Sequence, residues 1–312
     1  MIQESYKCAV CGCSRYSYAF SALRQVYKPA DLRDNKAFIY ICCDSCGFIS
    51  QQNTLLDEEL TQCYEEESYV VENSRFMEYL MFLYYHIARR LNKSRGKRIW
   101  DIGAGDGAYL AYAKRRGWQV CGSDISRYAR KLALVKRQIE VISMEETGEL
   151  PDKYFDRISL YNVLEHIKDP AGLLSLIKRK LKDNGTCVIM IPVVDSWEQA
   201  VFKGRSAWVS APYHLSMYSE HTMRKLAENN GFEIEKIYND WYTPSMFSFS
   251  IFEILQRRLG IFMPLEAKKI ISILMLPLIF PVILLAALFG KSALKSFYFT
   301  YEQKTAHREN QA

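Results

Sequence analysis

The stretch RIWDIGAGDG, residues 98–107, constrains the fold more than any other part of this chain of 312 residues. It is a short apolar segment that ends in an acid and continues into three glycines at alternate positions. Residues 107–116 then favour a helix that stops before Gly117. A strand, a glycine turn and a helix start form a nucleotide cradle, because the backbone can approach the ligand and free N–H groups face it. A tight strand-to-helix connection without a ligand has the same pattern.

Asp124 follows Gly107 by seventeen residues, at the end of a second predicted strand over 118–123. An acid at this place in a strand–helix–strand unit can accept hydrogen bonds from both hydroxyls of a ribose. Its presence favours a nucleotide-binding turn over a purely structural one.

The segment WDIGAGDG, residues 100–107, resembles the first motif of class I S-adenosylmethionine (SAM)-dependent methyltransferases. Phe155-Asp156 and the segment NVLEHIKDP, residues 162–170, resemble a later block of the same family. The resemblance covers about residues 98–240. It implies a class I methyltransferase fold with SAM as the cofactor.

The order of apolar segments independently predicts an α/β fold with a doubly wound, mostly parallel sheet. We expect strands over 98–102, 118–123, 140–143, 155–161, 186–191 and 232–239, and helices over 107–116, 126–138, 170–181 and 220–229. A helix over 72–94 leads into this core, and an antiparallel strand over 296–303 completes the seven-stranded, Rossmann-like sheet that the resemblance implies.

The chain divides into five expected parts. They are a zinc-ribbon-like segment (1–50), a linker with capping helices (51–95), the SAM-binding core (96–243), an apolar helical insert (244–295) and the last strand with its tail (296–312).

Nine cysteines are many for this length, and two C-x-x-C pairs lie about thirty residues apart. We predict that Cys8, Cys11, Cys43 and Cys46 bind a structural zinc ion, because four thiolates can form its tetrahedral site. Reduced cysteines packed as small apolar side chains are the alternative. The first ten residues lack the apolar run of a signal peptide, which favours a reducing compartment.

The resemblance also implies roles for the residues at the carboxyl ends of the strands. Asp101, Gly103, Gly105, Gly107 and Asn162 would lie near the methionine part of the cofactor, Asp124 would bind its ribose, and Ser143 and Met144 would flank its adenine.

Two histidines and one acid are candidates for proton transfer. His214 lies in a long loop predicted to overhang the acceptor, so it is the first choice for a general base. His166 is expected to position the reactants, and Glu165 is the alternative base. A loop histidine that only binds a backbone carbonyl would look the same in the sequence.

Residues 270–290 carry no charge and could span a bilayer, although Pro277 and Pro281 interrupt them. A spanning helix, a monotopic hairpin and a buried lid all fit. We expect a membrane-associating hairpin over 244–291 bent at the two prolines, because basic residues flank both of its ends. The net charge of +6 also fits an anionic surface, and no nucleic-acid-binding motif accompanies it.

The sequence therefore predicts a SAM-dependent methyltransferase that acts on a hydroxyl of a small or lipid-linked molecule, such as a glycan or quinone precursor. We expect it in the cytoplasm, peripheral or monotopic on the inner or plasma membrane. A non-catalytic SAM-binding scaffold, or a methyltransferase acting on nucleic acid or protein, are the alternatives.

Overall fold

The computed structural model describes residues 7–65, 91–240 and 244–301. Its centre is a seven-stranded sheet in the order β10-β11-β8-β7-β4-β5-β6. The strands are β4 (Arg98–Ile102), β5 (Gln119–Ser123), β6 (Val141–Ile142), β7 (Phe155–Tyr161), β8 (Leu181–Pro192), β10 (Glu233–Asp240) and β11 (Leu294–Thr300). All neighbouring pairs are parallel except those of β11, which is antiparallel to both β8 and β10. The predicted sheet and its antiparallel strand are confirmed.

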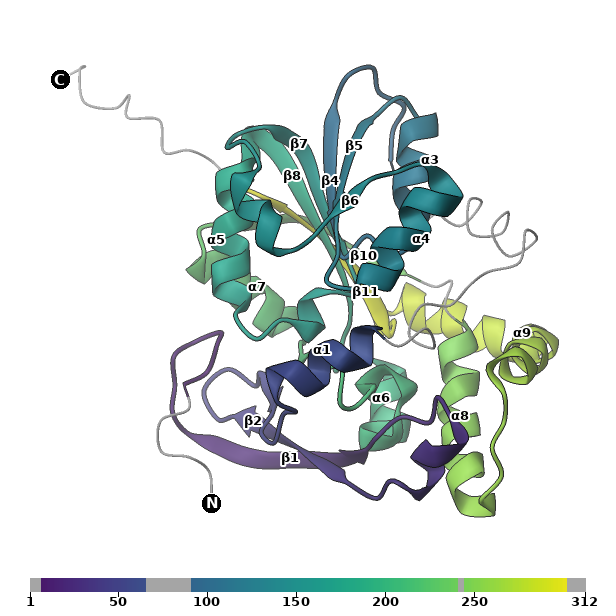
Figure 1. Ribbon diagram of the computed structural model, residues 1–312. Helices are drawn as coiled ribbons and strands as arrows, with labels where there is room; N and C mark the ends of the chain where they lie inside the picture. The colour runs from purple at the N-terminus through teal and green to yellow at the C-terminus, as the bar shows by residue number, and fades with distance from the viewer. Residues whose placement is uncertain (1–6, 66–90, 241–243, 302–312) are drawn as a thin grey trace.

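Helices cover both faces of this sheet (Figure 1). On one side lie α3 (Ala108–Arg115) and α4 (Arg127–Arg137), and on the other lie α5 (Pro170–Lys180) and α7 (Glu220–Asn229). Apolar side chains fill the space between the layers, with Trp100, Ile158 and Ile189 fully buried. Truncating a buried side chain such as Trp100 to alanine costs about 3–5 kcal/mol in cores of this kind.

A second sheet is built from the N-terminal segment. It has the order β1-β2-β3-β9, formed by β1 (Tyr16–Leu23), β2 (Ala37–Cys43), β3 (Ile49–Gln51) and β9 (Ser216–Met217). The last of these strands comes from the long loop after β8, so the two sheets share a connection. The helix α1 (Asp57–Glu65) and the 3-10 turn η1 (Pro29–Arg33) complete this layer.

The loop between β8 and β9 contains α6 (Trp197–Phe202) and the 3-10 turns η4 (Lys203–Arg205) and η5 (Ala207–Val209). Two further 3-10 turns, η2 (Glu145–Glu149) and η3 (Leu164–His166), follow β6 and β7. These turns lie near the carboxyl ends of the central strands, where doubly wound sheets bind their ligands.

The predicted insert forms two helices that pack on each other, α8 (Pro244–Leu259) and α9 (Leu265–Leu288). The chain reverses at residues 260–264, so the expectation that Pro277 and Pro281 form the hairpin turn is wrong. Both prolines lie inside α9. Gly260 has φ +66°, a left-handed conformation that ends α8 without the strain of a side chain.

Of the described residues, only those of α9 form a helix long and apolar enough to cross a membrane, by length and composition alone. Only 22% of its most apolar window is buried within the protein. Leu274 and Leu278 are 73% and 78% exposed. The helix therefore presents an uncovered apolar face.

Two further sequence expectations need correction. The strand expected over 186–191 begins five residues earlier, because β8 starts at Leu181 and includes Asn184 and Gly185 in a bulge against β7. The predicted helix over 72–94 lies mostly outside the described residues, and residues 91–94 are not helical.

Candidate active site

The glycine turn after β4 is held against the neighbouring strand. The N–H groups of Gly103 and Ala104 both donate to the carbonyl oxygen of Ser123, at 2.8 and 3.0 Å. Gly103 has φ +71°, and a Cβ atom there would lie 2.4 Å from Cγ2 of Val163. Only glycine therefore lets the segment after β7 pack on the turn.

Gly105 differs from Gly103 in its surroundings. Its φ is +56°, and a Cβ atom at this position would meet nothing within 4 Å. The turn is therefore open on this side, as a ligand cradle needs to be, and the geometry fits a bound cofactor. Gly107 lies at the N-cap of α3 with φ +74°.

Asp124 lies at the tip of β5 and ties the turn to α4. Its Oδ2 atom accepts from the Gly105 N–H at 2.8 Å, and its Oδ1 atom accepts from the Ser126 N–H at 2.9 Å. Each carboxylate oxygen can accept a second hydrogen bond. The position is therefore compatible with the expected contact to a ribose.

The other expected cofactor residues lie around the same edge of the sheet. Asp101 is buried on β4, and its Oδ1 atom accepts a 2.5 Å hydrogen bond from the Ser159 hydroxyl on β7. Asn162 follows β7 with an exposed side chain and φ +56°. Ser143 and Met144 follow β6, and the Ser143 N–H donates to Glu146 Oε2 at 2.7 Å.

The three candidates for proton transfer come together from separate parts of the chain. Glu165 and His166 lie in η3, after β7, whereas His214 lies in the loop after β8. The rings of His166 and His214 are 4.7 Å apart between centroids, and Nε2 of His214 lies 3.9 Å from Oε1 of Glu165. One possible ligand atom from each of the three lies within 4.8 Å of the other two, close enough to share one metal ion.

Hydrogen bonds set the tautomers of the two histidines. Nδ1 of His214 lies 2.7 Å from the Trp208 carbonyl oxygen, and Nδ1 of His166 lies 2.9 Å from that of Tyr213. A carbonyl oxygen can only accept, so we infer that both Nδ1 atoms carry the proton. Both Nε2 atoms then keep a lone pair.

Burial keeps the cluster uncharged near neutral pH. It lowers the pKa of His166 to about 4 and, together with the neighbouring His166, lowers the pKa of His214 well below its usual value. Burial also raises the pKa of Glu165 to about 8. Neither carboxyl oxygen of Glu165 has a hydrogen-bond partner among the described residues, although the side chain is only 1% exposed. An orphaned buried carboxyl group is costly and is typical of functional sites.

Tyr64 and Tyr40 also contact this cluster. The Tyr64 hydroxyl lies 3.1 Å from Nδ1 of His166, and the Tyr40 hydroxyl donates to the His214 carbonyl oxygen at 2.9 Å. Both come from the N-terminal layer. No motif distinguishes them among the 21 tyrosines of the sequence, so only the fold identifies them.

The four cysteines of the two C-x-x-C pairs form a compact group. The Sγ atoms of Cys8 and Cys46 are 3.6 Å apart, those of Cys11 and Cys43 are 3.5 Å apart, and none is in a disulfide. Zinc–sulfur bonds of about 2.3 Å at tetrahedral angles place sulfurs about 3.8 Å apart. The donor set therefore fits a zinc ion. Cys42, next to Cys43 in the sequence, is outside the group, and its Sγ atom lies near the Cys43 carbonyl oxygen.

Three features together define a class I SAM-dependent methyltransferase. They are a doubly wound sheet with antiparallel β11 between β8 and β10, a glycine turn after β4 and an acid after β5. A family model described as a methyltransferase domain matches residues 75–237, a little over half of the chain, and the chain belongs to this family.

Curated relatives share part of this core. A ubiquinone biosynthesis O-methyltransferase of Alkalilimnicola ehrlichii is 32% identical over 107 residues, which cover 32% of this chain and 43% of the relative. A protein of the same name from Aeromonas salmonicida is 36% identical over 102 residues, which cover 30% of this chain and 42% of the relative. The chain thus spans less than half the length of these relatives.

A solved structure is similar over most of the chain. The phosphoethanolamine N-methyltransferase 2 of Haemonchus contortus, in complex with SAM, has a TM-score of 0.51 and 16% sequence identity. The match covers 92% of this chain and 69% of that one. At this identity the likeness supports the fold alone.

Proposed function

We propose that this methyltransferase transfers a methyl group to a hydroxyl of a small or lipid-linked acceptor, such as a quinone or glycan precursor, at a membrane surface. The observation that carries the proposal is the buried cluster of Glu165, His166 and His214. It packs beside the glycine turn, because Val163 of the same segment contacts Gly103. The names of the curated relatives support an O-methyltransferase with a quinone precursor as acceptor.

The cofactor contacts follow the shape of the turn. SAM supplies a methyl group that its sulfonium charge already activates. We assign Gly103, Gly105, Gly107, Asp101 and Asn162 to the methionine part, Asp124 to the ribose, and Ser143 and Met144 to the adenine. The open side of the turn at Gly105 and the place of Asp124 at the tip of β5, where it accepts from the Gly105 N–H, support these assignments.

We assign proton removal to Nε2 of His214. This atom keeps a lone pair because Nδ1 donates to Trp208, and burial keeps the imidazole neutral. A neutral base can take the hydroxyl proton as the oxygen attacks. His166 packs edge-on against His214 and positions its ring. Glu165 lies beside the same ring, with its Oε1 atom 3.9 Å from Nε2 of His214.

The cysteine group has a structural role in this proposal. Four thiolates leave a zinc ion no open position for a substrate. The group adjoins the main core, since Cys8, Cys43 and Cys46 belong to the same buried apolar cluster as Trp100 and Phe155. Zinc would therefore stabilise the N-terminal layer against the methyltransferase core.

The exposed apolar face of α9 supports a place on the membrane surface. Both ends of the insert lead into adjacent antiparallel strands, β10 and β11. Its two ends are thereby tied to one side, which favours a monotopic hairpin over a single crossing. Its basic flanks favour the cytoplasmic face.

An assay with methyl-labelled SAM tests this function. We would supply hydroxylated quinone precursors, glycan precursors, protein and RNA separately, each with vesicles. We expect label in an ether of a hydroxylated small molecule, and none from a His214→Ala variant that still binds SAM. Label in protein or RNA only, or hydrolysis of SAM with no acceptor labelled, would overturn the proposal.

A further inference from the structure

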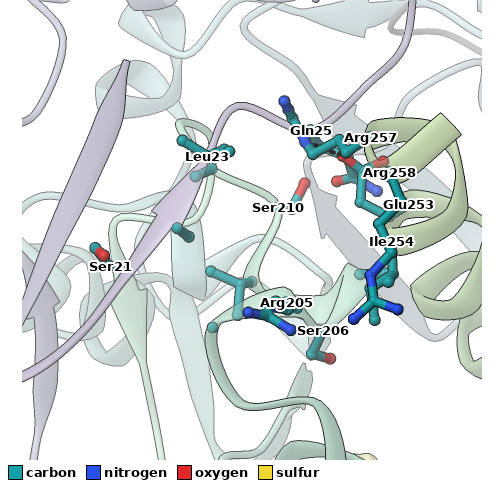
Figure 2. Close-up of a pocket in the computed structure, with 15 residues that line it drawn as sticks. Ser21, Leu23, Gln25, Arg205, Ser206, Ser210, Glu253, Ile254, Arg257 and Arg258 are labelled. Carbon is teal, nitrogen blue, oxygen red and sulfur yellow. Dashed lines mark hydrogen bonds and ion pairs between the residues drawn. The ribbon is translucent and has the colours of Figure 1, made fainter. Parts of the chain in front are cut away.

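A separate cavity of about 450 Å³ lies between the N-terminal sheet, the loop after β8 and helix α8 (Figure 2). Its walls come from β1, from residues 204–211 and from one side of α8. None of the residues assigned above to SAM or to proton transfer lines it. The volume is in the range of sites for small ligands, about 300–1,000 Å³.

The cavity is positively charged. Arg205, Arg257 and Arg258 line it, and Glu253 is its one acidic lining residue among the described part of the chain. Glu253 is already engaged, since its Oε1 atom lies 3.1 Å from Nε of Arg257 and its Oε2 atom accepts from the Val26 N–H at 3.3 Å.

Two guanidinium groups are left without a counter-charge. Arg205 and Arg258 are exposed, and neither forms an ion pair with another residue that the structure describes. Ser206 and Ser210 also line the space, and the Ser210 hydroxyl lies 3.2 Å from the Tyr27 hydroxyl. The cavity thus carries about two uncompensated positive charges.

We infer that this cavity binds a phosphate or diphosphate group. Guanidinium groups recognise phosphate through paired, charge-assisted hydrogen bonds, and two of them, one from η4 and one from α8, match a doubly charged anion. A carboxylate ligand would use one such fork and leave the other uncompensated. The inference goes beyond the proposed methyl transfer and does not depend on it.

The place of the cavity suggests two sources for the group. Helix α8, which carries Arg257 and Arg258, packs on α9 with its uncovered apolar face, so the headgroup of a lipid could enter from a membrane. A soluble phosphorylated molecule could also enter. One wall of the cavity is bonded to the backbone of the candidate base, because the Ser210 carbonyl oxygen accepts from the His214 backbone N–H at 3.3 Å.

Calorimetry with pyrophosphate tests the inference on the full chain without SAM. The test variant is Arg205→Gln with Arg258→Gln. The control is Arg95→Gln with Arg115→Gln, two exposed arginines outside the cavity that give the same change in net charge. We expect pyrophosphate to bind at least about tenfold more weakly to the test variant, since hydrogen bonds to charged groups are lost, and nearly unchanged to the control.

A second experiment, with lipid vesicles, tells whether the bound phosphate belongs to a lipid headgroup or to a soluble molecule. Phosphatidylcholine vesicles with and without phosphatidic acid are sedimented with each protein. Binding that depends on phosphatidic acid and is lost only in the test variant assigns a lipid headgroup. Pyrophosphate binding without this dependence assigns a soluble phosphate. If neither probe separates the test variant from the control, the inference is wrong. Unchanged SAM affinity in the test variant shows that it is folded and leaves the proposed methyl transfer standing.

Discussion

Nε2 of His214 lies 3.9 Å from Oε1 of Glu165, although 48 residues separate the two along the chain. The Leu215 N–H donates to the Glu165 carbonyl oxygen at 2.9 Å, so the backbone as well as the side chains joins the loop after β8 to the segment after β7. The candidate base is thus fixed against the glycine turn before an acceptor arrives.

His214→Ala should lower the turnover number by roughly 10²–10⁴-fold, as expected for the loss of a general base, with little change in SAM affinity. Steady-state kinetics and calorimetry measure the two. His221→Ala is the matched control, since this exposed histidine on α7 lies outside the cluster. If turnover survives His214→Ala but not Glu165→Ala, the base is Glu165.

The stability of the protein should fall as pH rises from about 6.5 to 8, because of Glu165. Below about 6.5 the lowered pKa values of His166 and His214 act in the opposite direction. Burial raises the pKa of this carboxyl group to about 8, from an ordinary value of 4.5. Between these values the unfolded chain has released the proton and the native one retains it, so unfolding is favoured by about 1.4 kcal/mol per pH unit. Urea unfolding at several pH values between about 6.5 and 8 should show this slope in the wild type and its absence in Glu165→Gln. Equal slopes would place the Glu165 carboxyl group in a more polar setting than described.

Asp124→Ala should weaken SAM binding by on the order of 2–3 kcal/mol, because buried ribose hydroxyls and the Gly105 N–H lose their acceptor. Asp124→Asn keeps one acceptor oxygen and should lose less. Asp183→Ala, on the bulge of β8, is the control. Titration calorimetry gives the affinities. Unchanged SAM affinity in Asp124→Ala would reject the assigned ribose contact.

Purified protein should contain about one zinc ion per chain, held by the four cysteines. Cys8→Ser or Cys46→Ser should remove the metal and destabilise the N-terminal layer, whereas Cys42→Ser should retain it. Elemental analysis and thermal unfolding of the three variants test this. Metal-free wild-type protein, purified without chelator, would favour cysteines packed as apolar side chains.

Vesicle flotation tests the face of α9. Wild-type protein should float with the vesicles. The double variant Leu274→Ser with Leu278→Ser should partition into vesicles more weakly, by several kcal/mol at most, because burying one exposed leucine side chain contributes about 1.5–3 kcal/mol. Leu134→Ser on α4, also exposed, is the control. A wild-type protein that stays in solution would instead favour a lid or an interface between proteins.

The central sheet was predictable because its strands carry local signals. Buried apolar runs such as that of β4 end in glycine or acidic residues. The antiparallel strand expected over 296–303 corresponds to β11. The reversal of the insert was not predictable from Pro277 and Pro281. A proline in an apolar helix loses one hydrogen bond, and packing of α9 on α8 can outweigh that loss.

The pairing of the N-terminal sheet with β9 has no local signal at all. Two residues, Ser216 and Met217, pair with β3 across more than 160 positions of sequence. The contact between Tyr64 and His166 likewise joins residues far apart in the sequence and has no local signal. The candidate site could therefore be predicted in its motifs but not in its surroundings.

The shared strand β9 also bears on how proteins of this architecture can be recombined. The loop that carries His214 is anchored in one sheet through β8 and in the other through β9, and the Gln51 N–H donates to the Leu215 carbonyl oxygen at 2.8 Å. A chimera that replaces residues 1–51 with those of another protein would also replace β3, the strand that holds the His214 loop in the second sheet. The cysteine segment and the loop after β8 therefore have to be transplanted as one unit.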